Sequence, residues 1–443
     1  MNVVNIDRRD FLKASTIAAS GLVLGLSNFT KLAKGVTKSS LPPYLQIELD
    51  GSIYLGVPSS EMGQGSHTGL AMLLAEELEI DMSQIHRVET IHHPDFKNNF
   101  IASAAPAFRL QMTGYSSTIR AWYIPFRKLG ATARELMRNA AALKWEVPVE
   151  ECIARNGIIA HSTSSRSLAY GELAQDASRI KLPKDIKLKS PKQFWLLGKS
   201  AARLDTKAKI NGTAVFGTDV DLPGMLFGTV KHCKVFGEKL ISVDDTKAKE
   251  VPGVIAVIPL EDQAVVVADS TWDAMKGADV LKLVTSGGHK DLSDESIFRR
   301  FRSDLSKSGV TAAQVGDSSK AIAKANKVLE LEYEMPMQAH ATMEPICATA
   351  SVTPDECSIW GPVQNQDAVM GFAMSVTSLP PEKIKVNTTF VGGGFGRKFE
   401  VDFLEAPLVA SKVMGKPVKV IWKREEDTRN DFFRPPTLAK MRI

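Results

Sequence analysis

Four glycines lie within the stretch FVGGGFGRKFE at residues 390–400, and no other feature of the sequence limits the local fold as strongly. The preceding KVNTTF has the pattern of a strand, and Phe403, Leu404 and Leu408 share one face of a helix expected to begin near Phe399. A strand, glycine loop and helix in this order present N–H groups and a positive dipole end, which favours an anion or an electronegative ligand. The alternative is a tight turn packed under a sheet. The spacing matches neither G-x-G-x-x-G nor G-x-x-x-x-G-K-[ST].

A second glycine loop, EMGQG at residues 61–65, has the same surroundings. The segment before it, LQIELDGSIYLGVP, alternates apolar and polar residues on both sides of Asp50-Gly51 and predicts a β-hairpin. The segment after it predicts a helix with Ser66 and Thr68 as candidate caps, because leucines recur at helical spacing at Leu70, Leu73, Leu74 and Leu78. A G-x-G turn before a helix is common, so this loop alone does not establish a ligand.

A third polar segment, QMTGYSSTIR, precedes a long helical pattern over residues 116–144 that contains Pro125, where we expect a break. Hydroxyl groups at a helix start usually cap the helix, and the same groups can hold a phosphate. Asn156-Gly157 predicts a further hairpin turn.

The middle of the chain changes character. Residues 181–197 are cationic and proline-spaced, which predicts a linker. Residues 198–290 alternate β-rich segments, MLFGTVKHC, GVIAVIPL and QAVVVADS, with a short helical segment, TWDAMKGADVLK. This pattern predicts an α+β module, and a polar helical stretch follows it over residues 291–327.

Charge and cysteine content exclude several classes of site. The formal net charge of +5 comes from 55 basic and 50 acidic residues spread along the chain, so nucleic-acid binding is not indicated. The four cysteines include no C-x-x-C pair, which argues against a structural zinc site or an iron–sulfur cluster held by this chain alone. Cys347 and Cys357 remain candidates either for a disulfide or for two buried thiols.

The amino-terminal residues have the layout of a twin-arginine export signal. Arg8-Arg9 and Phe11-Leu12-Lys13 precede a moderately apolar run from Ala14 to Leu26. We therefore expect export to the periplasm, with residues 1–40 as signal and spacer. An amphipathic leader helix and a membrane anchor are the alternatives, although the run is short for a span of about 20 residues.

Three motifs in this order resemble those of one known family. SSEMGQGSHTGLAMLLAEEL, QAHATMEP and FVGGGFGRK are similar to the molybdopterin-binding large subunit of the xanthine dehydrogenase and aldehyde oxidase family, and particularly to the exported isoquinoline 1-oxidoreductase β-subunits within it. The stretch from TAVFGTDVDLPGMLFGTV to VVVADSTWDA resembles the a/b hammerhead domain of these enzymes. The resemblance runs from about residue 41 to the end of the chain. It implies a multidomain α+β fold with molybdopterin-binding α/β segments at residues 41–180 and 291–443 and a hammerhead domain at residues 198–290.

The resemblance also implies roles for single residues. Gln338 matches the glutamine that hydrogen-bonds an oxygen ligand of molybdenum. The residues that match the loop beside the metal and the pterin, with the cation that follows it, are Gly393, Gly394, Phe395, Gly396 and Arg397. A pterin contact is implied for Gly63, Gln64 and Gly65, and contact with the pyrophosphate of a dinucleotide cofactor for Thr113, Gly114, Ser116 and Ser117. We expect Gly394 to have a positive φ. The pterin dithiolene holds the metal, so no protein ligand to it is expected.

Enzymes of this type transfer oxygen from water to an electron-poor carbon of an aldehyde or an N-heteroaromatic ring, with a glutamate as base. A small iron–sulfur subunit is implied as electron acceptor, with a downstream acceptor such as a cytochrome. The Gly-x-Gly-Glu-type segment that carries the glutamate is absent, and Glu61 and Glu344 do not match it. We therefore expect a truncated or split chain that is inactive by itself, with the missing carboxyl-terminal half as a possible separate partner. The alternative is a non-catalytic assembly partner that keeps the fold and binds no metal.

Overall fold

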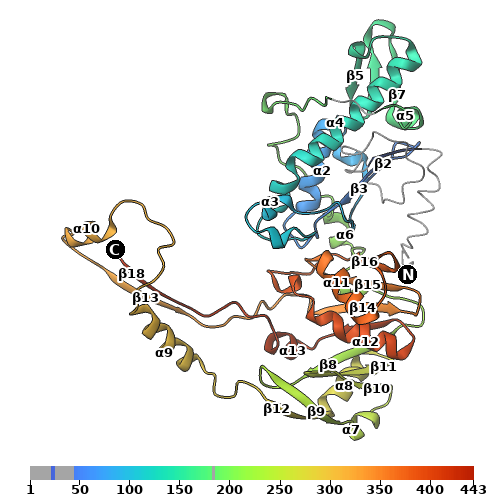
Figure 1. The fold of residues 1–443 in the computed structure, drawn as a ribbon. Coiled ribbons are helices and arrows are strands. Elements are labelled where there is room, and N and C mark those ends of the chain that lie inside the picture. Colours follow the sequence, from blue (N-terminus) through green and yellow to red (C-terminus); the bar gives the residue numbers. More distant parts are fainter. Residues whose placement is uncertain (1–20, 25–43, 182–184) are drawn as a thin grey trace. The chain divides into compact units, whose positions relative to one another are not determined.

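The computed structural model describes residues 21–24, 44–181 and 185–443 (Figure 1). These residues divide into two compact units. The first unit comprises the described residues up to Met225 together with Cys347–Lys419, and the second comprises Leu226–Ile346 and Val420–Ile443. Both units mix helices and strands, so the α+β fold class is confirmed. The chain leaves the first unit and later returns to it, which brings the residues after 346 beside those before 226.

The first sheet of the first unit has four strands in the order β1-β2-β3-β4, which span Leu22–Leu24, Leu45–Ile47, Ile53–Val57 and Ile85–Thr90. β2 and β3 are antiparallel across the Asp50-Gly51 turn, where Gly51 has a φ of 85°, so the predicted hairpin is confirmed. β3 and β4 are parallel, and helix α2 (Ser66–Leu78) forms the crossover between them. The loop at residues 61–65 therefore lies at the carboxyl end of β3.

Most of the leader lies outside the described residues, including Arg8-Arg9 and the start of the apolar run. The described part of that run, Leu22–Leu24, forms β1, which is antiparallel to β2 and has Leu22 and Leu24 buried. The run is thus a strand rather than a helix at these three residues. In the part of the chain that the structure describes, no helix combines the length and apolarity needed to cross a bilayer.

Helix α4 (Thr118–Trp145) packs against α2 and continues through Pro125 without a break. The expected break is wrong, because proline removes only one N–H group while Trp122 and Phe126 of the adjoining turns remain packed in the core. Gly130 permits the close approach of the two helices, since a Cβ there would lie 3.2 Å from the Cβ of Glu77.

A small antiparallel sheet and three short helices complete the amino-terminal part of the first unit. The sheet has the order β5-β6-β7, with strands at Cys152–Arg155, Ile158–His161 and Arg166–Ala169. Asn156-Gly157 joins β5 to β6 with both residues at positive φ, so this hairpin prediction is confirmed. The remaining helices are α3 (Asn99–Ala102), α5 (Tyr170–Ala177) and α6 (Thr206–Ile210).

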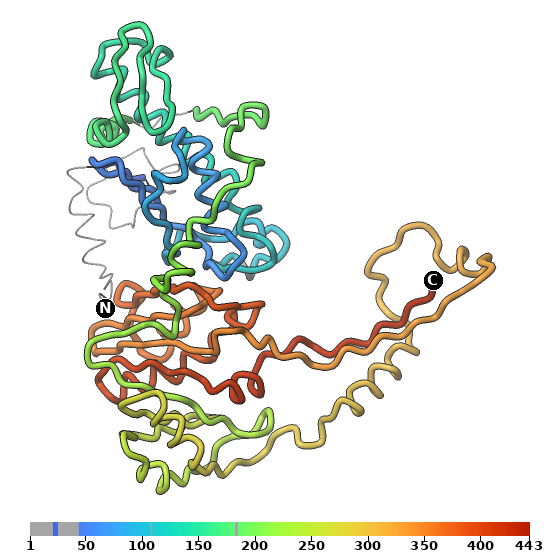
Figure 2. The backbone as a smooth tube through the Cα atoms, turned by 180° about the vertical axis from the view of Figure 1, so that it is seen from behind, coloured from blue at the N-terminus to red at the C-terminus, as the bar shows by residue number. Residues whose placement is uncertain are grey.

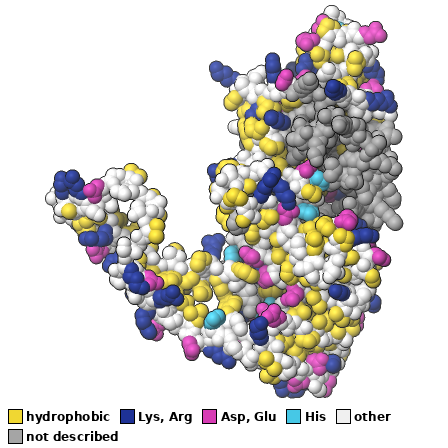
Figure 3. Space-filling view, viewed as in Figure 1, with side chains coloured by type: hydrophobic (Ala, Val, Ile, Leu, Met, Phe, Trp, Pro, Cys, Tyr) yellow, Lys and Arg dark blue, Asp and Glu magenta, His cyan; other side chains and the backbone are white. Residues whose placement is uncertain are grey.

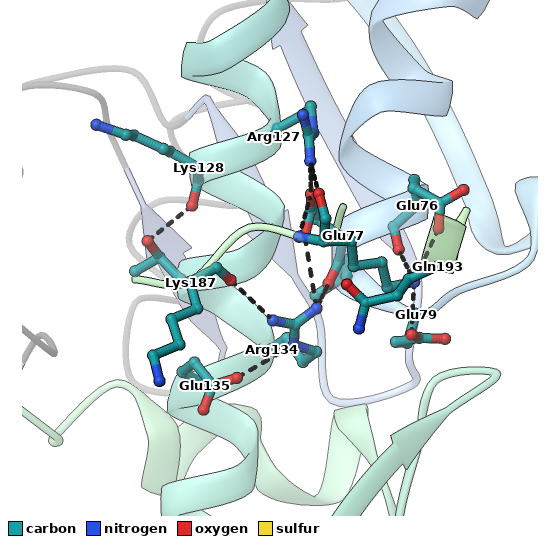
Figure 4. A network of polar contacts seen from close by, with 12 residues as sticks. Glu76, Glu77, Glu79, Arg127, Lys128, Arg134, Glu135, Lys187 and Gln193 are labelled. Atoms are coloured by element: carbon teal, nitrogen blue, oxygen red, sulfur yellow. Dashed lines mark hydrogen bonds and ion pairs between the residues drawn. The ribbon is translucent and has the colours of Figure 1, made fainter. Parts of the chain in front are cut away.

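Two adjacent glutamates of α2 anchor the segment expected to be a linker (Figure 4). Glu76 and Glu77 have no exposed side-chain surface. Glu77 accepts hydrogen bonds from Arg127 Nε and Nη2 at 2.9 and 2.7 Å, and Figure 4 shows its carboxylate between Arg127 and Arg134. Glu76 accepts one from Lys189 Nζ at 2.8 Å and one from the backbone N–H of Leu196 at 2.8 Å. The chain around Lys189 is therefore bonded to α2 and α4.

The carboxyl-terminal part of the first unit contains strands in the order β14-β15-β16, which span Cys347–Val352, Cys357–Gly361 and Ile384–Thr388, and β14 also neighbours β17 (Val418–Ile421), whose first two residues belong to this unit. Helices α11 (Gln366–Thr377) and α12 (Glu405–Met414) connect them. All four cysteines are buried, and none of them forms a disulfide. Cys357 lies opposite Val352 in the β14–β15 ladder rather than opposite Cys347, so the ladder keeps the two sulfurs apart.

The second unit contains a sheet segment in the order β10-β11-β8 and a two-stranded sheet of β12 and β9. These strands span Val254–Pro259, Gln263–Ala268, Leu226–His232, Lys282–Gly287 and Glu238–Asp244. The strands expected from MLFGTVKHC, GVIAVIPL and QAVVVADS are thus β8, β10 and β11. The expected helix is α8 (Thr271–Val280), which packs on β8 and β11, and α7 (Thr246–Lys249) precedes β10.

A two-stranded antiparallel ribbon of β13 (Glu330–Met335) and β18 (Thr437–Arg442) completes the second unit (Figure 2). The helices expected over residues 291–327 are α9 (Asp294–Leu305) and α10 (Ser318–Ala323), and α13 (Arg424–Arg429) follows β17. Arg302 of α9 forms ion pairs with Glu332 and Glu334 of the ribbon. On the visible face, basic and acidic side chains are interspersed rather than gathered in one patch (Figure 3), which agrees with the mixed charge of the sequence.

Short 3-10 turns lie at Met82–Gln84, Pro106–Phe108, Val149–Glu151, Ser162–Ser164, Pro191–Gln193, Gly217–Asp219, Pro381–Lys383, Arg397–Phe399 and Asp402–Leu404. The last two separate the glycine loop from α12, which begins at Glu405. The expected helix start near Phe399 is therefore wrong. The amino-terminal dipole of α12 does not act directly on the glycine loop.

Candidate functional site

Four segments of the first unit that are far apart in sequence are joined by hydrogen bonds. They are residues 59–66, 111–118, 363–367 and 390–398. Ser60 donates its N–H to Thr113 Oγ1 at 2.8 Å and its hydroxyl to the Val363 carbonyl at 2.6 Å, and Val391 N–H donates to the Glu61 carbonyl at 3.0 Å. The structure thus brings together the three loops that the sequence identified and adds a fourth, residues 363–367.

The loop around Gly63-Gln64-Gly65 closes around the carboxylate of Glu61. This side chain is 1% exposed and accepts hydrogen bonds from the N–H groups of Gly63 and Gly65 at 3.0 Å each and of His67 at 3.1 Å. The predicted caps Ser66 and Thr68 are wrong, because Gly65 is the N-cap residue, with a φ of 79°, and no side chain of its own. Glu61 supplies the anion that the amino terminus of α2 attracts.

Gln64 also bonds within its own loop. Its Oε1 accepts a hydrogen bond from Met62 N–H at 2.8 Å, and its Nε2 donates to the Ser60 carbonyl at 2.9 Å. Arg203 holds the same loop from outside, donating to the Gly63 carbonyl at 2.7 Å and to Glu61 Oε1 at 3.0 Å. The sequence does not single out Arg203, because it lies in a segment without a motif.

Arg203 is itself fixed by Asp205, to which it donates from Nε at 2.9 Å and Nη2 at 2.7 Å. This hydrogen bond raises the pKa of Arg203, and despite partial burial it lowers the pKa of Asp205. Glu61, Arg203 and Asp205 therefore form a charged row in which each acid is ionised and paired.

The ionisation of Glu61 makes the stability of this loop dependent on pH. Burial raises the pKa of Glu61, but the N–H groups of His67 and Gly65 more than offset it, so the net shift is downward. A carboxyl with a lowered folded-state pKa stabilises the protein above the unfolded-state value of about 4.3, and this contribution is lost as the pH falls through the folded-state value. Burial also lowers the pKa of His67 below its unfolded-state value of about 6.5, so the neutral imidazole likewise stabilises the folded state above that pH and this contribution is lost as the pH falls.

We expect Glu61→Gln to lower the free energy of unfolding of the first unit by about 1–3 kcal/mol at pH 7, since backbone N–H groups lose a charged acceptor. Urea titrations at pH 7 and pH 4 provide the measurement. The variant should lose less stability than the wild type between these pH values, because it lacks one titrating carboxylate. Equal losses in both proteins would show that Glu61 does not stabilise the folded state as an ion.

The hydroxyl groups of Thr113 and Ser117 in the third loop also form their hydrogen bonds within the protein. Thr113 Oγ1 accepts from Ser60, and Ser117 Oγ donates to the Gly114 carbonyl at 2.7 Å and accepts from Asn98 Nδ2 at 2.7 Å. Tyr115 and Ser116 are exposed and both have positive φ, at 54° and 51°. Left-handed backbone is uncommon for such residues away from helix ends, and strained positions of this kind cluster at functional sites. Tyr115 and Ser116 therefore form the exposed tip of this segment, which a ligand can reach.

In the glycine loop, Gly393, Phe395 and Gly396 have positive φ, at 95°, 53° and 110°. Gly394 does not, so the expectation of a positive φ at this residue is wrong. Its requirement for glycine is steric, because a Cβ there would overlap Oε1 of Gln364 and lie 3.1 Å from Met62 Sδ. Two loops and Gln364 thus meet at Gly394.

Arg397 is 1% exposed and bonds to both carboxylate oxygens of Asp402, at 2.8 Å each. Its guanidinium lies 6.0 Å from the ring centre of Phe403. The cation implied at this position by the resemblance is therefore neutralised within the protein. It anchors the base of the glycine loop.

Gln338 belongs to the second unit, whereas the four segments above belong to the first. Its backbone pairs with Arg434, and its side chain is exposed. Two residues on, His340 is fixed by Asp431, which accepts hydrogen bonds from the His340 backbone N–H and from Nδ1 at 2.9 Å. Asp431 thereby holds the segment that presents Gln338.

Comparison with known proteins agrees with the resemblance found in the sequence. Two family models, both described as a molybdopterin cofactor-binding domain, match residues 19–221 and 302–443. The chain is 29% identical to the beta chain of isoquinoline 1-oxidoreductase of Brevundimonas diminuta, over 97% of this chain and 61% of that protein. It is 28% identical to a nicotinate dehydrogenase component of Pseudomonas putida, over 93% of this chain and 35% of that protein.

A third relative is a membrane-bound aldehyde dehydrogenase of Gluconacetobacter polyoxogenes, named as a pyrroloquinoline-quinone enzyme. It is 29% identical over 90% of this chain and 52% of its own length. The chain therefore spans from about a third to three fifths of the length of these curated relatives. Both matched regions include loops described above, residues 59–66 and 111–118 in the first and 363–367 and 390–398 in the second.

Proposed function

Because residues 19–221 and 302–443 are molybdopterin cofactor-binding domains, we propose that this chain is a cofactor-binding subunit of a molybdenum hydroxylase. The proposed enzyme oxidises an N-heteroaromatic compound or an aldehyde with oxygen taken from water. A separate iron–sulfur subunit accepts the electrons and passes them to a downstream acceptor such as a cytochrome. The names of the relatives, isoquinoline 1-oxidoreductase, nicotinate dehydrogenase and aldehyde dehydrogenase, support this range of substrates.

The observation that carries the proposal is the joining of loops from both matched regions. Residues 113 and 364 belong to different family-model matches, yet Thr113 N–H donates to the Gln364 carbonyl at 2.7 Å. A protein that merely retained the fold would need the hydrophobic pattern but not glycine-rich loops with strained, exposed tips. The proposal therefore rests on the combination of buried polar anchors with exposed loop tips.

The exposed tips of three loops suit a molybdopterin dinucleotide. They are Gly63-Gln64, Tyr115-Ser116 and Phe395-Gly396, and none carries a charged side chain. Behind them, Glu61 is paired with Arg203 and Arg397 with Asp402. The tips therefore offer amide and N–H groups to a polar pterin edge and to phosphate oxygens. We assign the pyrophosphate to the exposed tip at Tyr115 and Ser116, because the Thr113 and Ser117 hydroxyls bond within the protein.

When bound, such a cofactor supplies a two-electron redox centre, whereas the residues of this chain bind and orient it. Gln338 donates or accepts a hydrogen bond near the reacting oxygen. The base that takes up a proton is a glutamate of the Gly-x-Gly-Glu type, which we assign to the length of the relatives that this chain does not span. The proposal includes export by the twin-arginine pathway, which rests on Arg8-Arg9 and the following apolar run alone.

The direct test is the cofactor content of the chain purified through a tag from its native host. Molybdenum is measured by mass spectrometry and pterin by the fluorescence of its oxidised form. We expect both in equal amounts, together with a co-purifying iron–sulfur protein. A stable complex with that partner that holds neither molybdenum nor pterin would instead support the non-catalytic assembly role.

We expect Gln338→Ala to reduce turnover of the assembled enzyme about 10- to 150-fold, since a hydrogen bond to a charged group contributes about 1.5–3 kcal/mol. Molybdenum content should be unchanged, because the side chain of Gln338 is exposed and the backbone of this segment is held by Arg434 and Asp431. Gln314→Ala, in an exposed stretch of the same unit, is the control and should keep full activity. Unchanged turnover in Gln338→Ala would remove the proposed role of Gln338.

A further inference from the structure

We propose that Gln364 is a positioning residue that couples the glycine loop to the Thr113 segment through the two ends of its side-chain amide. Nothing in the sequence motifs singles out this glutamine, which lies in GPVQNQD just before α11. The proposal rests on the proposed function only in taking these two loops as cofactor-binding. The coupling itself is a property of the protein alone.

The side chain of Gln364 connects the two loops directly. Its Nε2 donates to the Thr113 carbonyl at 3.0 Å, and its Oε1 accepts from Gly396 N–H at 3.2 Å. The backbone makes the same two connections, since Gln364 N–H donates to the Lys398 carbonyl and the Gln364 carbonyl accepts from Thr113 N–H, both at 2.7 Å. Only 3% of the residue is exposed, so water does not substitute readily for these bonds.

An amide is the group that this geometry requires. One loop presents a carbonyl oxygen, which needs a donor, and the other presents an N–H group, which needs an acceptor. Glutamate has the same shape but lacks the donor when ionised, so it would place a negative charge against the Thr113 carbonyl. Protonated glutamic acid restores one donor and keeps one acceptor. The side-chain amide of Gln364 thus fixes the distance between the two loops, because one of its polar atoms bonds to each loop.

Gln364 also explains why residue 394 is a glycine. A Cβ at Gly394 would overlap Oε1 and lie 3.0 Å from Cδ of Gln364. The amide therefore occupies the space that the missing side chain leaves, and the two positions depend on each other.

The segment around Gln364 has anchors of its own, which makes the proposal testable without unfolding the protein. Asp367 accepts hydrogen bonds from His92 Nε2 at 3.0 Å and from Gln111 N–H at 2.7 Å. Gln366 Nε2 donates to Ser60 Oγ at 2.8 Å. These contacts do not involve the side chain of Gln364, so they persist when it is changed.

The test compares Gln364→Glu with the wild type by amide hydrogen exchange, followed by mass spectrometry of the peptides that cover residues 111–118 and 392–398. At pH 8 we expect exchange about tenfold faster or more in both peptides, because two buried hydrogen bonds are weakened. At pH 5 we expect the buried glutamate to take up a proton. The ratio of the exchange rate in the variant to that in the wild type at the same pH should then fall toward one.

Asn365→Asp is the matched control. Asn365 is equally buried and precedes α11. Its Oδ1 accepts a hydrogen bond from Ala368 N–H, and an aspartate keeps this acceptor. This variant should leave exchange in both loops unchanged. Wild-type exchange in Gln364→Glu at pH 8, or faster exchange in one loop alone, would overturn the coupling.

Molybdenum content of the same samples separates this inference from the proposed function. Faster exchange of both loops in a protein whose wild type holds no molybdenum would retain the coupling and reject the cofactor. Molybdenum in the wild type, together with unchanged exchange in Gln364→Glu, would retain the cofactor and reject the coupling.

Discussion

Replacing Glu77 with alanine is expected to lower the free energy of unfolding of the first unit by about 3–5 kcal/mol, because removing one partner of a buried ion pair leaves the other charge buried and uncompensated. Glu77 has no exposed side-chain surface, and Arg127, which bonds to it twice, is 7% exposed. Arg134 lies 3.6 Å from the same carboxylate, and Lys189 N–H donates to it at 3.2 Å. Urea titration followed by far-ultraviolet circular dichroism measures the change.

Glu135→Ala is the control for this prediction. Glu135 pairs with Arg134 and Arg138 in the same region, but its side chain is 20% exposed, so its loss should cost only about 0–1 kcal/mol. Equal losses in the free energy of unfolding for the two substitutions would mean that the burial of Glu77 does not increase the contribution of its ion pairs to stability. A small effect of both would mean that α2 and α4 are held by apolar packing alone.

The contacts of Glu76 and Glu77 with Lys189 explain why the sequence alone predicts a linker around Lys189. The composition of this segment, cationic and rich in proline, is that of an extended solvated chain, and Glu76 and Glu77 occur in the helical run LLAEELEID as ordinary surface acids would. Their burial depends on α4 and on residues more than a hundred positions away, such as Lys189 and Leu196. A local sequence pattern cannot identify partners that lie so far away in the sequence.

Local elements are predictable where the signal is local. The Asp50-Gly51 and Asn156-Gly157 turns need positive φ, which glycine and asparagine adopt readily, and both hairpins are confirmed. The pattern predicts the beginning of α2 correctly but not its cap, because Glu61 reaches the helix from five residues before it. It predicts the start of α12 too early, since the apolar spacing of Phe403 and Leu404 continues through a 3-10 turn.

The candidate site shows the same division. Glycine-rich loops at residues 63–65 and 392–396 are visible in the sequence because close backbone approach excludes side chains. The residues that hold these loops, Arg203, Gln364 and Asp402, are missed, because each acts through contacts with a distant segment or a neighbouring turn that no local pattern encodes. A buried amide that serves two loops leaves no periodic or compositional trace, and only the folded chain identifies it.

Replacing Gly394 with valine is expected to reduce molybdenum and pterin retention by about 5- to 150-fold, which corresponds to the 1–3 kcal/mol that overpacking a filled site typically costs. The reason is the contact with Gln364 and Met62, not the backbone angle, since Gly394 does not have a positive φ. The protein should still fold, because the strain falls on a loop outside the helices and strands, whose base is held by Arg397 and Asp402. Cofactor content and circular dichroism of the same sample measure the two effects separately.

Gly371→Ala is the matched control, because this glycine lies in α11 with no atom within 4 Å of an added Cβ, and it should keep full cofactor content. The double variant Gly394→Ala/Gln364→Ser identifies the source of the strain. If the amide of Gln364 is the obstacle, the destabilisation caused by Gly394→Ala should be smaller when Gln364 is shortened, and the two substitutions should not be additive. Additive effects would place the strain elsewhere in the loop. Full cofactor retention in Gly394→Val would mean that the glycines serve only to pack a turn, and the cofactor would then have to be held without this loop.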